Sequence, residues 1–405
     1  MPLHRSVRSL CSRNFSRIVL PLSLALALVG CGSSPKIVCN GTSVSSASCP
    51  VSPGPEVLYG FAATQLLNLS MSTTIDASTG GFGNITSGPT PFFANGAAVA
   101  SNAQFLYISN SYIDGQPNNG SQIFGYSISP VDGTLTELTG SPFFLFPPPS
   151  SIQGLAISPN GQFLYGADYS GFIYGFSVDS TSGTLSLISG TPLASGPNAQ
   201  LVVDPSGKFL YASNDNDPND SILAFTIGSS GALTPVPNSP FAIPGSMGGT
   251  SEPYGIVDTG SFVYTPLVTN QVAAFSVNSA TGALSSVPGS PFPAGPVPFF
   301  LALANNNNFL YVQNQDGSIS AYTIDSSSGA LTPLSNSPFT GLNAETLATD
   351  STGQYLYLGT FKGVQGYSID STTGALTEVP AKFGEDGALW LTTVQLPPSA
   401  TQQPQ

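Results

Sequence analysis

The chain has 405 residues, of which only 7% are charged, and its formal net charge at pH 7 is −13. Nucleic-acid binding needs a basic surface that displaces counterions from phosphates, so this composition excludes that class of partner. The 44 glycines and 36 prolines do not imply disorder, because 40% of the residues are hydrophobic and can build a core.

The first 30 residues have the pattern of a cleaved signal peptide. Four arginines precede an apolar run of 11 residues, 18–28, which is too short to span a bilayer comfortably. The segment Leu28-Val29-Gly30-Cys31 resembles the lipobox of bacterial lipoproteins, in which the cysteine is acylated and becomes the first residue. This resemblance, with Gly32 next, implies a lipid anchor in the cell envelope, at the outer membrane. An ordinary signal peptide with an incidental cysteine is the alternative.

Residues 31–55 are rich in Ser, Gly and Pro, which is the composition of a flexible tether. After cleavage and acylation of Cys31, Cys39 and Cys49 are the remaining thiols. In an oxidising compartment we expect a disulfide between them rather than a metal site, because two sulfurs without a histidine are a poor ligand set. The processed chain keeps 21 acids and four lysines, a formal charge of about −17, and has no arginine or histidine.

Seven short apolar segments end in tyrosine, typically as Phe-Leu-Tyr. Successive tyrosines are separated by 48, 58, 46, 53, 47 and 46 residues, close to the period of about 40 to 50 in which four short strands form one propeller blade. The seven tyrosines are Tyr59, Tyr107, Tyr165, Tyr211, Tyr264, Tyr311 and Tyr357.

Each repeat contains further predicted strands. A third strand has Gly or Ala at a fixed position, and a glycine turn precedes a fourth. A first strand precedes every tyrosine strand except the first, whereas a surplus strand, 389–394, follows the last repeat. We therefore predict an all-β fold over residues 56–396, a seven-bladed β-propeller with four antiparallel strands per blade, whose ring is closed by the C-terminal strand joining blade one. Residues 397–405 are expected to be a loose tail.

The connections from second to third strands, and from fourth strands to the next blade, vary most, and ligand-binding residues concentrate on such loops. The acidic residues that we place on this face are Asp168, Glu252, Asp316 and Glu345. Their spacing does not specify acid–base catalysis.

One of these loops, residues 214–221, reads Asn-Asp-Asn-Asp-Pro-Asn-Asp-Ser. Asp215, Asp217, Asn219 and Asp220 could surround Ca²⁺ or Mg²⁺ with the hard oxygen ligands that these ions take. The loop lacks the glycine and distal glutamate of an EF-hand, and a solvated acidic turn is the alternative. Nothing else in the sequence requires a cofactor.

Residues 204–215, Asp-Pro-Ser-Gly-Lys-Phe-Leu-Tyr-Ala-Ser-Asn-Asp, and the later Gly-Ala-Leu-Thr resemble the seven-bladed lactonase family, which includes 6-phosphogluconolactonase-like and YVTN-repeat propellers. The resemblance covers about residues 56–396 and implies the same fold. Members with lactonase activity typically carry Arg and His just before a first strand. The comparable positions here hold Gln153-Gly154, Ala199-Gln200 and Pro253-Tyr254, so the usual cationic grip on an anionic sugar acid is missing.

The sequence favours a binding module: a lipid-anchored, monomeric propeller that presents its variable loops to a protein or carbohydrate partner outside the cytoplasm. The alternative is a lactonase-type hydrolase, 6-phosphogluconolactonase-like, that uses carboxylates with or without a divalent cation. A Ser-His-Asp triad is excluded in the processed chain, which has no histidine.

Overall fold

The computed structural model describes residues 36–39, 42–45, 54–62, 69–89, 94–100, 102–110, 122–144, 152–168, 170–196, 198–214, 220–245, 253–383 and 388–397. Pro53–Pro397 form one compact unit. In the segment predicted as a tether, β1 (Lys36–Cys39) and β2 (Thr42–Ser45) pair antiparallel. Among the residues that the structure describes, no helix is long and apolar enough to cross a membrane.

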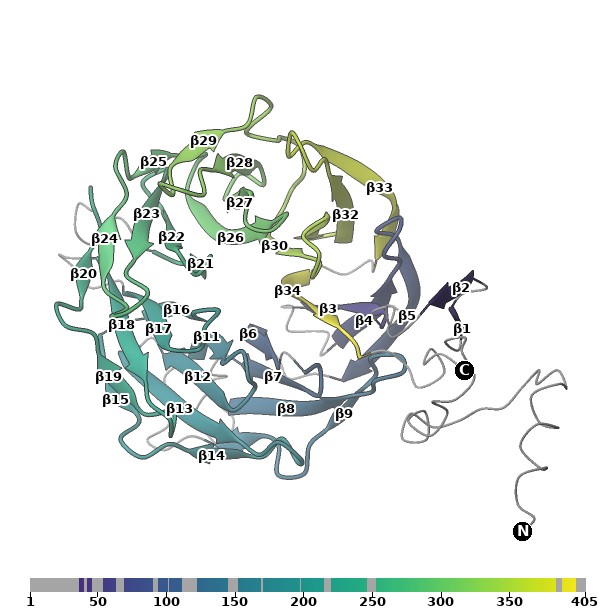
Figure 1. Ribbon diagram of the computed structural model, residues 1–405, viewed down its shortest axis with the longest axis horizontal. Coiled ribbons are helices and arrows are strands. Elements are labelled where there is room, and N and C mark those ends of the chain that lie inside the picture. Colours follow the sequence, from purple (N-terminus) through teal and green to yellow (C-terminus); the bar gives the residue numbers. More distant parts are fainter. Residues whose placement is uncertain are drawn as a thin grey trace, which may run out of the picture. The chain divides into compact units, whose positions relative to one another are not determined.

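Seven antiparallel sheets are arranged in a ring around a central axis (Figure 1). Their strands, in order from the innermost outwards, are as follows. Blade 1 has β34 (Ala388–Gln395), β3 (Glu56–Ala62), β4 (Leu69–Ile75) and β5 (Phe82–Pro89); blade 2 has β6 (Ala94–Val99), β7 (Phe105–Asn110), β8 (Gln122–Ile128) and β9 (Leu135–Glu137); blade 3 has β11 (Ile152–Ile157), β12 (Phe163–Asp168), β13 (Phe172–Val178) and β14 (Leu185–Leu187); blade 4 has β16 (Asn198–Val203), β17 (Phe209–Asn214), β18 (Ser221–Ile227) and β19 (Leu233–Pro235).

The remaining three blades repeat this order. Blade 5 has β21 (Val257–Asp258), β22 (Phe262–Leu267), β23 (Gln271–Val277) and β24 (Leu284–Ser286); blade 6 has β26 (Pro298–Ala304), β27 (Phe309–Asn314), β28 (Ile319–Ile324) and β29 (Leu331–Pro333); blade 7 has β30 (Thr346–Thr349), β31 (Tyr355–Thr360), β32 (Gly363–Ile369) and β33 (Leu376–Phe383). The predicted all-β, seven-bladed propeller is confirmed.

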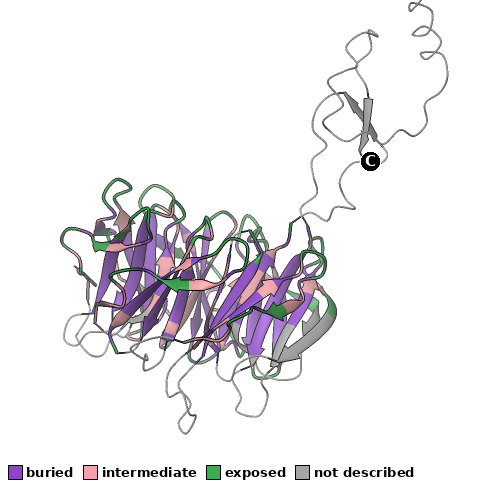
Figure 2. Ribbon diagram, turned by 90° about the horizontal axis from the view of Figure 1, so that it is seen from below, coloured by how far each residue is buried: buried purple, intermediate pink, exposed green. Residues whose placement is uncertain are grey.

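The meander within each blade gives the ring two different faces. Turns between first and second strands, and between third and fourth strands, lie on one face, which we call the turn face. Connections from second to third strands, and from fourth strands to the next blade, lie on the opposite face, the loop face. Figure 2 shows the ring from the side, with buried residues along the strands and exposed residues mainly in the connections.

The C-terminal strand closes the ring as predicted. β34 pairs antiparallel with β3, with Val57 opposite Val394 and Phe61 opposite Trp390, and takes the innermost position of blade 1. The side chain of Trp390, which we expected to be a core anchor, lies outside the described residues. On the turn face Glu56 reaches blade 7, where its carboxylate accepts hydrogen bonds from the Ser351 backbone N–H at 2.5 Å and hydroxyl at 2.9 Å.

The outer edge of blades 2–5 differs from the prediction of four strands. Each of these blades carries a fifth strand of two residues that pairs with the third strand beyond the fourth. A proline between the two outer pieces has no N–H for the ladder, so the outer strand is interrupted there. The short strands are β10 (Phe143–Phe144), β15 (Leu193–Ala194), β20 (Phe241–Ala242) and β25 (Phe292–Pro293).

The core consists of apolar layers between neighbouring blades. In blade 2, for example, Leu106 packs towards blade 1, whereas Phe105 and Tyr107 pack towards blade 3. The triplet that ends in tyrosine therefore contributes to two layers at once. All three of its side chains are buried, with Leu106 and Tyr107 fully so.

Each of the seven tyrosines also makes a hydrogen bond to the next blade. The hydroxyl of Tyr165 donates to the carbonyl oxygen of Gly231 at 2.8 Å, and Tyr357 of blade 7 donates to Gly80 of blade 1 at 3.2 Å, which completes the circle. The acceptors are the glycines of the turns between third and fourth strands. The other five pairs are Tyr59 with Gly133, Tyr107 with Gly183, Tyr211 with Gly282, Tyr264 with Gly329, and Tyr311 with Gly374.

The accepting residue must be glycine for two reasons. Gly231 has a φ of 81°, a conformation that residues with a Cβ rarely adopt. A Cβ at this position would also lie 2.5 Å from the ring of Phe163, the first residue of the preceding blade's triplet. The triplet and the turn glycine thus fit together across the blade boundary.

We predict that Tyr165→Phe lowers the free energy of unfolding by about 1–3 kcal/mol, because it leaves the buried Gly231 carbonyl without its donor. The matched control is Tyr126→Phe, at a buried tyrosine whose hydroxyl has no hydrogen-bond partner among the described residues. Urea unfolding monitored by circular dichroism measures both. Equal midpoints for the two variants would contradict a stabilising role for the bond.

Candidate functional site

Three of the acids predicted on the loop face lie in its described part. Asp168 ends β12 and is fully buried; its carboxylate accepts a hydrogen bond from the Phe172 N–H at 2.8 Å. Burial, and then the neighbouring Asp168, raises the pKa of Tyr174 to about 12. Asp168 is thus held inside the blade, where it fixes the loop before β13.

Asp316 lies in the exposed loop between β27 and β28. Its carboxylate accepts bonds from the Ser318 backbone N–H at 3.0 Å and hydroxyl at 2.6 Å, so it stabilises its own turn. Glu345 immediately precedes β30, the innermost strand of blade 7, and is half-buried. Its backbone N–H donates to the Gly359 carbonyl at 2.8 Å, which fixes its position at the start of the strand.

The remaining predicted site residues fall mostly outside the described part of the chain. This holds for Glu252, Cys31, Cys49, the side chain of Cys39, and the proposed cation ligands Asp215, Asp217 and Asn219. Asp220, the fourth proposed ligand, directly precedes β18 and is buried. The described residues contain no group of three or more His, Cys, Asp or Glu that could hold a metal ion.

Two sets of carboxyl groups can be distinguished by the direction of their pKa shift. Hydrogen bonds from hydroxyl and backbone donors in the turns lower the pKa of Asp325 to about 2 and lower that of Asp179 and Asp370. In the described part of the chain, desolvation raises the pKa of Glu56, Asp258 and Glu345. Glu56 and Asp258 lie on the turn face, so Glu345 is the carboxyl of raised pKa on the loop face.

Near the start of the first strands, the loop face carries uncharged side chains in neighbouring blades. The amide Nε2 of Gln200 donates to the Gln153 carbonyl at 2.9 Å, which links blades 3 and 4. The rings of Tyr254 and Phe299 lie 5.0 Å apart at 51°, which links blades 5 and 6. Gln153, Gln200 and Tyr254 are the positions at which the family pattern leads one to expect Arg or His.

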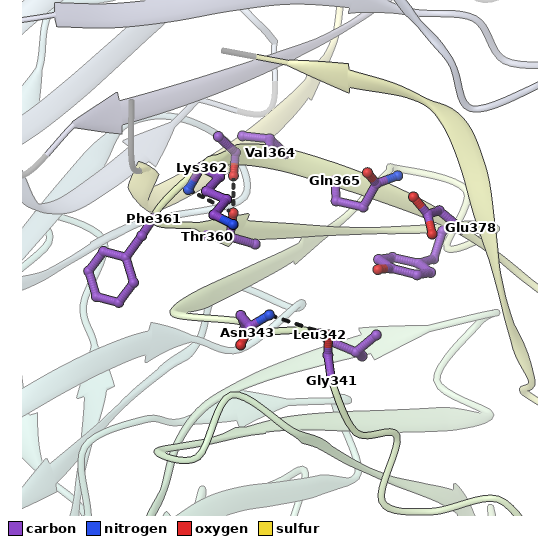
Figure 3. Close-up of a pocket in the computed structure, with 11 residues that line it drawn as sticks. Gly341, Leu342, Asn343, Thr360, Phe361, Lys362, Val364, Gln365 and Glu378 are labelled. Atoms are coloured by element: carbon purple, nitrogen blue, oxygen red, sulfur yellow. Dashed lines mark hydrogen bonds between the residues drawn. The ribbon is translucent and has the colours of Figure 1, made fainter. Parts of the chain in front are cut away.

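A groove of about 420 Å³ lies between blades 6 and 7 on the loop face (Figure 3). Residues 341–343, which lead from blade 6 to β30, form one side. The tip of the β31–β32 hairpin, with Phe361 and Lys362, forms another, and Gln365, Tyr367 and Glu378 continue along the blade. The sequence does not reveal this groove, because the groove depends on the packing of two separate loops.

The buried carboxyl of Asp258 follows from the length of one turn. In blade 4 the turn from Asp204 to Phe209 lets one carboxylate oxygen accept from the Phe209 N–H at 2.6 Å and the other from Ser206. In blade 5 the turn is one residue shorter, and Asp258 accepts from the Gly260 N–H at 2.6 Å with Oδ1 only. Oδ2 is buried and has no hydrogen-bond partner among the residues that the structure describes.

Comparison with known proteins supports the family resemblance. Residues 262–390 match the family model described as lactonase, 7-bladed beta-propeller. The solved structure of a periplasmic gluconolactonase from Pseudomonas aeruginosa is similar, with a TM-score of 0.67 and 16% identity over 85% of this chain and 99% of that one. A proposed 6-phosphogluconolactonase from Bacteroides uniformis has a TM-score of 0.67 and 19% identity, with 85% and 100% covered.

A search of curated protein sequences found no match. The ring of seven sheets makes the molecule a seven-bladed propeller, and the segment that matches the lactonase family model runs from β22 through blade 7 into β34. The predicted resemblance is confirmed. At these identities the solved structures establish the shared fold alone.

We predict that Asp258→Asn stabilises the protein at pH 8 and loses this advantage at pH 4. Desolvation, with Asp204 as a further cause, raises the Asp258 pKa from 3.8 to about 6. A raised folded-state pKa means that the folded state binds the proton more tightly than the unfolded chain, so stability falls as pH rises from about 4 to 6 and stays low above it. The neutral amide removes a cost on the order of 3 kcal/mol.

Urea unfolding at the two pH values measures this effect. The control is Asp325→Asn, at an exposed carboxyl whose lowered pKa gives the opposite sign, a loss of stability at pH 8. A midpoint for Asp258→Asn at pH 8 that is equal to or below that of the original chain would show that the buried carboxylate carries no such cost.

Proposed function

We propose that this protein is a lactone hydrolase of the cell envelope that uses carboxylate chemistry on an uncharged sugar lactone. The observation that carries the proposal is Glu345, a half-buried loop-face carboxyl whose pKa is raised by desolvation. It lies within residues 262–390, which match the lactonase family. The likeness to a periplasmic gluconolactonase supports both the activity and the compartment.

The chemistry requires a base and a way to release the ring oxygen. In lactone hydrolysis a water molecule attacks the carbonyl carbon, and the bond from that carbon to the ring oxygen then breaks. Glu345 would take the proton of the attacking water and return it to the departing oxygen, which leaves a hydroxy acid and an unchanged carboxylate. A carboxyl with a raised pKa suits both steps, because general catalysts work best when their pKa is near the working pH.

The charge of the chain restricts the substrate. After removal of the leader the chain carries about 17 net negative charges and no arginine. Such a surface repels phosphorylated and carboxylated substrates and offers no bidentate donor for them. A neutral lactone of a polyhydroxylated sugar, bound through amide and hydroxyl groups such as those of Gln153 and Tyr254, is the substrate class that this supports.

The comparisons favour this hydrolase over the binding module that the sequence favoured. The binding module, its protein or carbohydrate partner and the monomeric state stay predictions, as do the lipid anchor at Cys31 and the disulfide between Cys39 and Cys49. A cation at Asp215, Asp217, Asn219 and Asp220 would be an addition to the hydrolase, and the proposed proton transfer does not need it.

We predict that the protein hydrolyses D-glucono-1,5-lactone and that Glu345→Gln lowers kcat/KM by about 10²–10⁴-fold, the contribution typical of a general base. Asp316→Asn is the matched control, an exposed loop-face carboxyl that stabilises its own turn. Acid release at constant pH, corrected for spontaneous hydrolysis, measures the rate. A hydrolysis rate no faster than that in buffer alone would refute the hydrolase. Equal rates for the two variants would refute the role of Glu345.

We further propose lipid anchoring at Cys31, which accounts for the lipobox-like sequence before it. Cys31→Ser is expected to move the protein from the membrane fraction to the soluble fraction with an unchanged melting temperature, because the anchor and the propeller are separate in sequence. Fractionation and immunoblotting measure this. A variant that stays with the membrane after its leader is cleaved would show that acylation at Cys31 is not the anchor.

A further inference from the structure

The groove between blades 6 and 7 results from a local departure from the repeat. In blades 2–6 the chain returns after the fourth strand and places an apolar residue opposite an apolar residue near the start of the third strand, for example Phe241 opposite Ile222 in blade 4. In blade 7 β33 instead continues along β32 with a register shift between Gln365 and Tyr367. Blade 7 therefore presents a different outer surface to residues 341–343, the loop that arrives from blade 6.

The next residue along the third strand varies between blades. Facing the preceding blade, it is Tyr174 in blade 3 and Leu223 in blade 4, both buried in apolar layers. In blade 7 it is Gln365. Its Nε2 donates to the carbonyls of Gly366 at 3.1 Å and Val379 at 2.9 Å, which fixes the amide in the groove wall.

A large aromatic side chain stands at the opening of the groove. Phe361 is 69% exposed, although it occupies a tight hairpin with little freedom. The Thr360 hydroxyl donates to the Gly363 carbonyl at 2.9 Å and accepts from the Lys362 N–H at 3.1 Å, so the turn is held on both sides. An exposed aromatic ring on a fixed backbone can contact a ligand with little loss of conformational freedom.

Hydrogen-bonding groups line the rest of the groove. Figure 3 shows Phe361 at one end of the groove, Gln365 and Glu378 at the other, and Asn343 with Leu342 along the facing side. The volume of about 420 Å³ is within the range of about 300–1,000 Å³ for small-ligand pockets. An aromatic face beside amide, hydroxyl and carboxylate groups matches a sugar ring, which has an apolar C–H face and a rim of hydroxyls.

We propose that this groove binds a neutral oligosaccharide, with Phe361 stacked on one sugar ring and the exposed side chains of Asn343 and Glu378 hydrogen-bonded to hydroxyls. A neutral ligand fits better than a charged one, because the groove is lined by one lysine and one glutamate and has no excess of either sign. The site is distinct from the proposed hydrolytic carboxyl and does not rest on it. Glu345 lies two residues beyond Asn343 on the same connection, so a residue that would bind the saccharide is close in sequence to that carboxyl.

Saturation-transfer NMR and calorimetric titration of the full chain with maltohexaose and with cellohexaose test the proposal. Phe361→Ala is expected to weaken binding of the hexasaccharide at least about tenfold, the loss of an aromatic contact of ~1.4 kcal/mol. Val131→Ala is the matched control, at another large apolar residue, 73% exposed, on the turn face; it should leave binding unchanged. High salt should also leave it unchanged, since the ligand is neutral.

The inference is overturned if neither hexasaccharide binds at millimolar concentration, if Phe361→Ala binds as the original chain does, or if Val131→Ala loses binding equally. Binding that falls steeply with salt would indicate a charged ligand and would also overturn it. These readouts are independent of lactone turnover, so failure of the hydrolase and failure of the saccharide site can be told apart.

Discussion

The hydrogen bond from a tyrosine hydroxyl to a glycine carbonyl of the next blade is the constraint on which the ring depends. It joins residues that are 63 to 76 positions apart in six cases and 277 apart where blade 7 meets blade 1. Because burial raises the pKa of tyrosines such as Tyr165, these phenols remain protonated donors well above neutral pH. The accepting glycine needs a positive φ and has no room for a Cβ, so one residue type satisfies the turn, the packing and the bond. With the blades fixed from the turn face, the loop face is free to vary in sequence.

The fold was predictable because it is repeated. The tyrosine spacing indicates seven blades, and the surplus strand after the last repeat, together with the missing first strand of the first repeat, determines how the ring closes; β34 beside β3 confirms both. The tyrosine-to-glycine bond was not predicted, because each residue has a sufficient local explanation, core packing for one and hairpin geometry for the other. The fifth strand of blades 2–5 was missed because a Ser-Pro-Phe segment predicts an interruption but not a return to the same sheet.

The candidate site was predictable only in outline. Sequence pattern can place an acid at the end of a second strand or before a first strand. It cannot distinguish Asp168 from Glu345, because these two residues differ mainly in burial, which depends on the neighbouring blade. Asp168 is enclosed and accepts a backbone hydrogen bond, whereas Glu345 keeps part of its surface in solvent. A signal for Asp258 did exist, since its turn is one residue shorter than that of Asp204. Gln365 is not such a signal for the groove, because the same position is apolar in blades 3 and 4 but is Ser320 in blade 6.

The propeller contains no arginine or histidine, so the pKa values of its carboxyl groups are adjusted by other means, and in two directions. Turn carboxylates such as Asp325 accept several hydrogen bonds, which stabilise the charged form and make these groups weak bases. Carboxyls that lose solvent without gaining enough donors, such as Asp258, become stronger bases. The turn carboxylates stabilise the fold. The desolvated carboxyls are stronger bases, and their burial costs stability. Glu345 combines a raised pKa with partial exposure and a position beside the variable loops. For this reason it is the residue on which the proposed function rests.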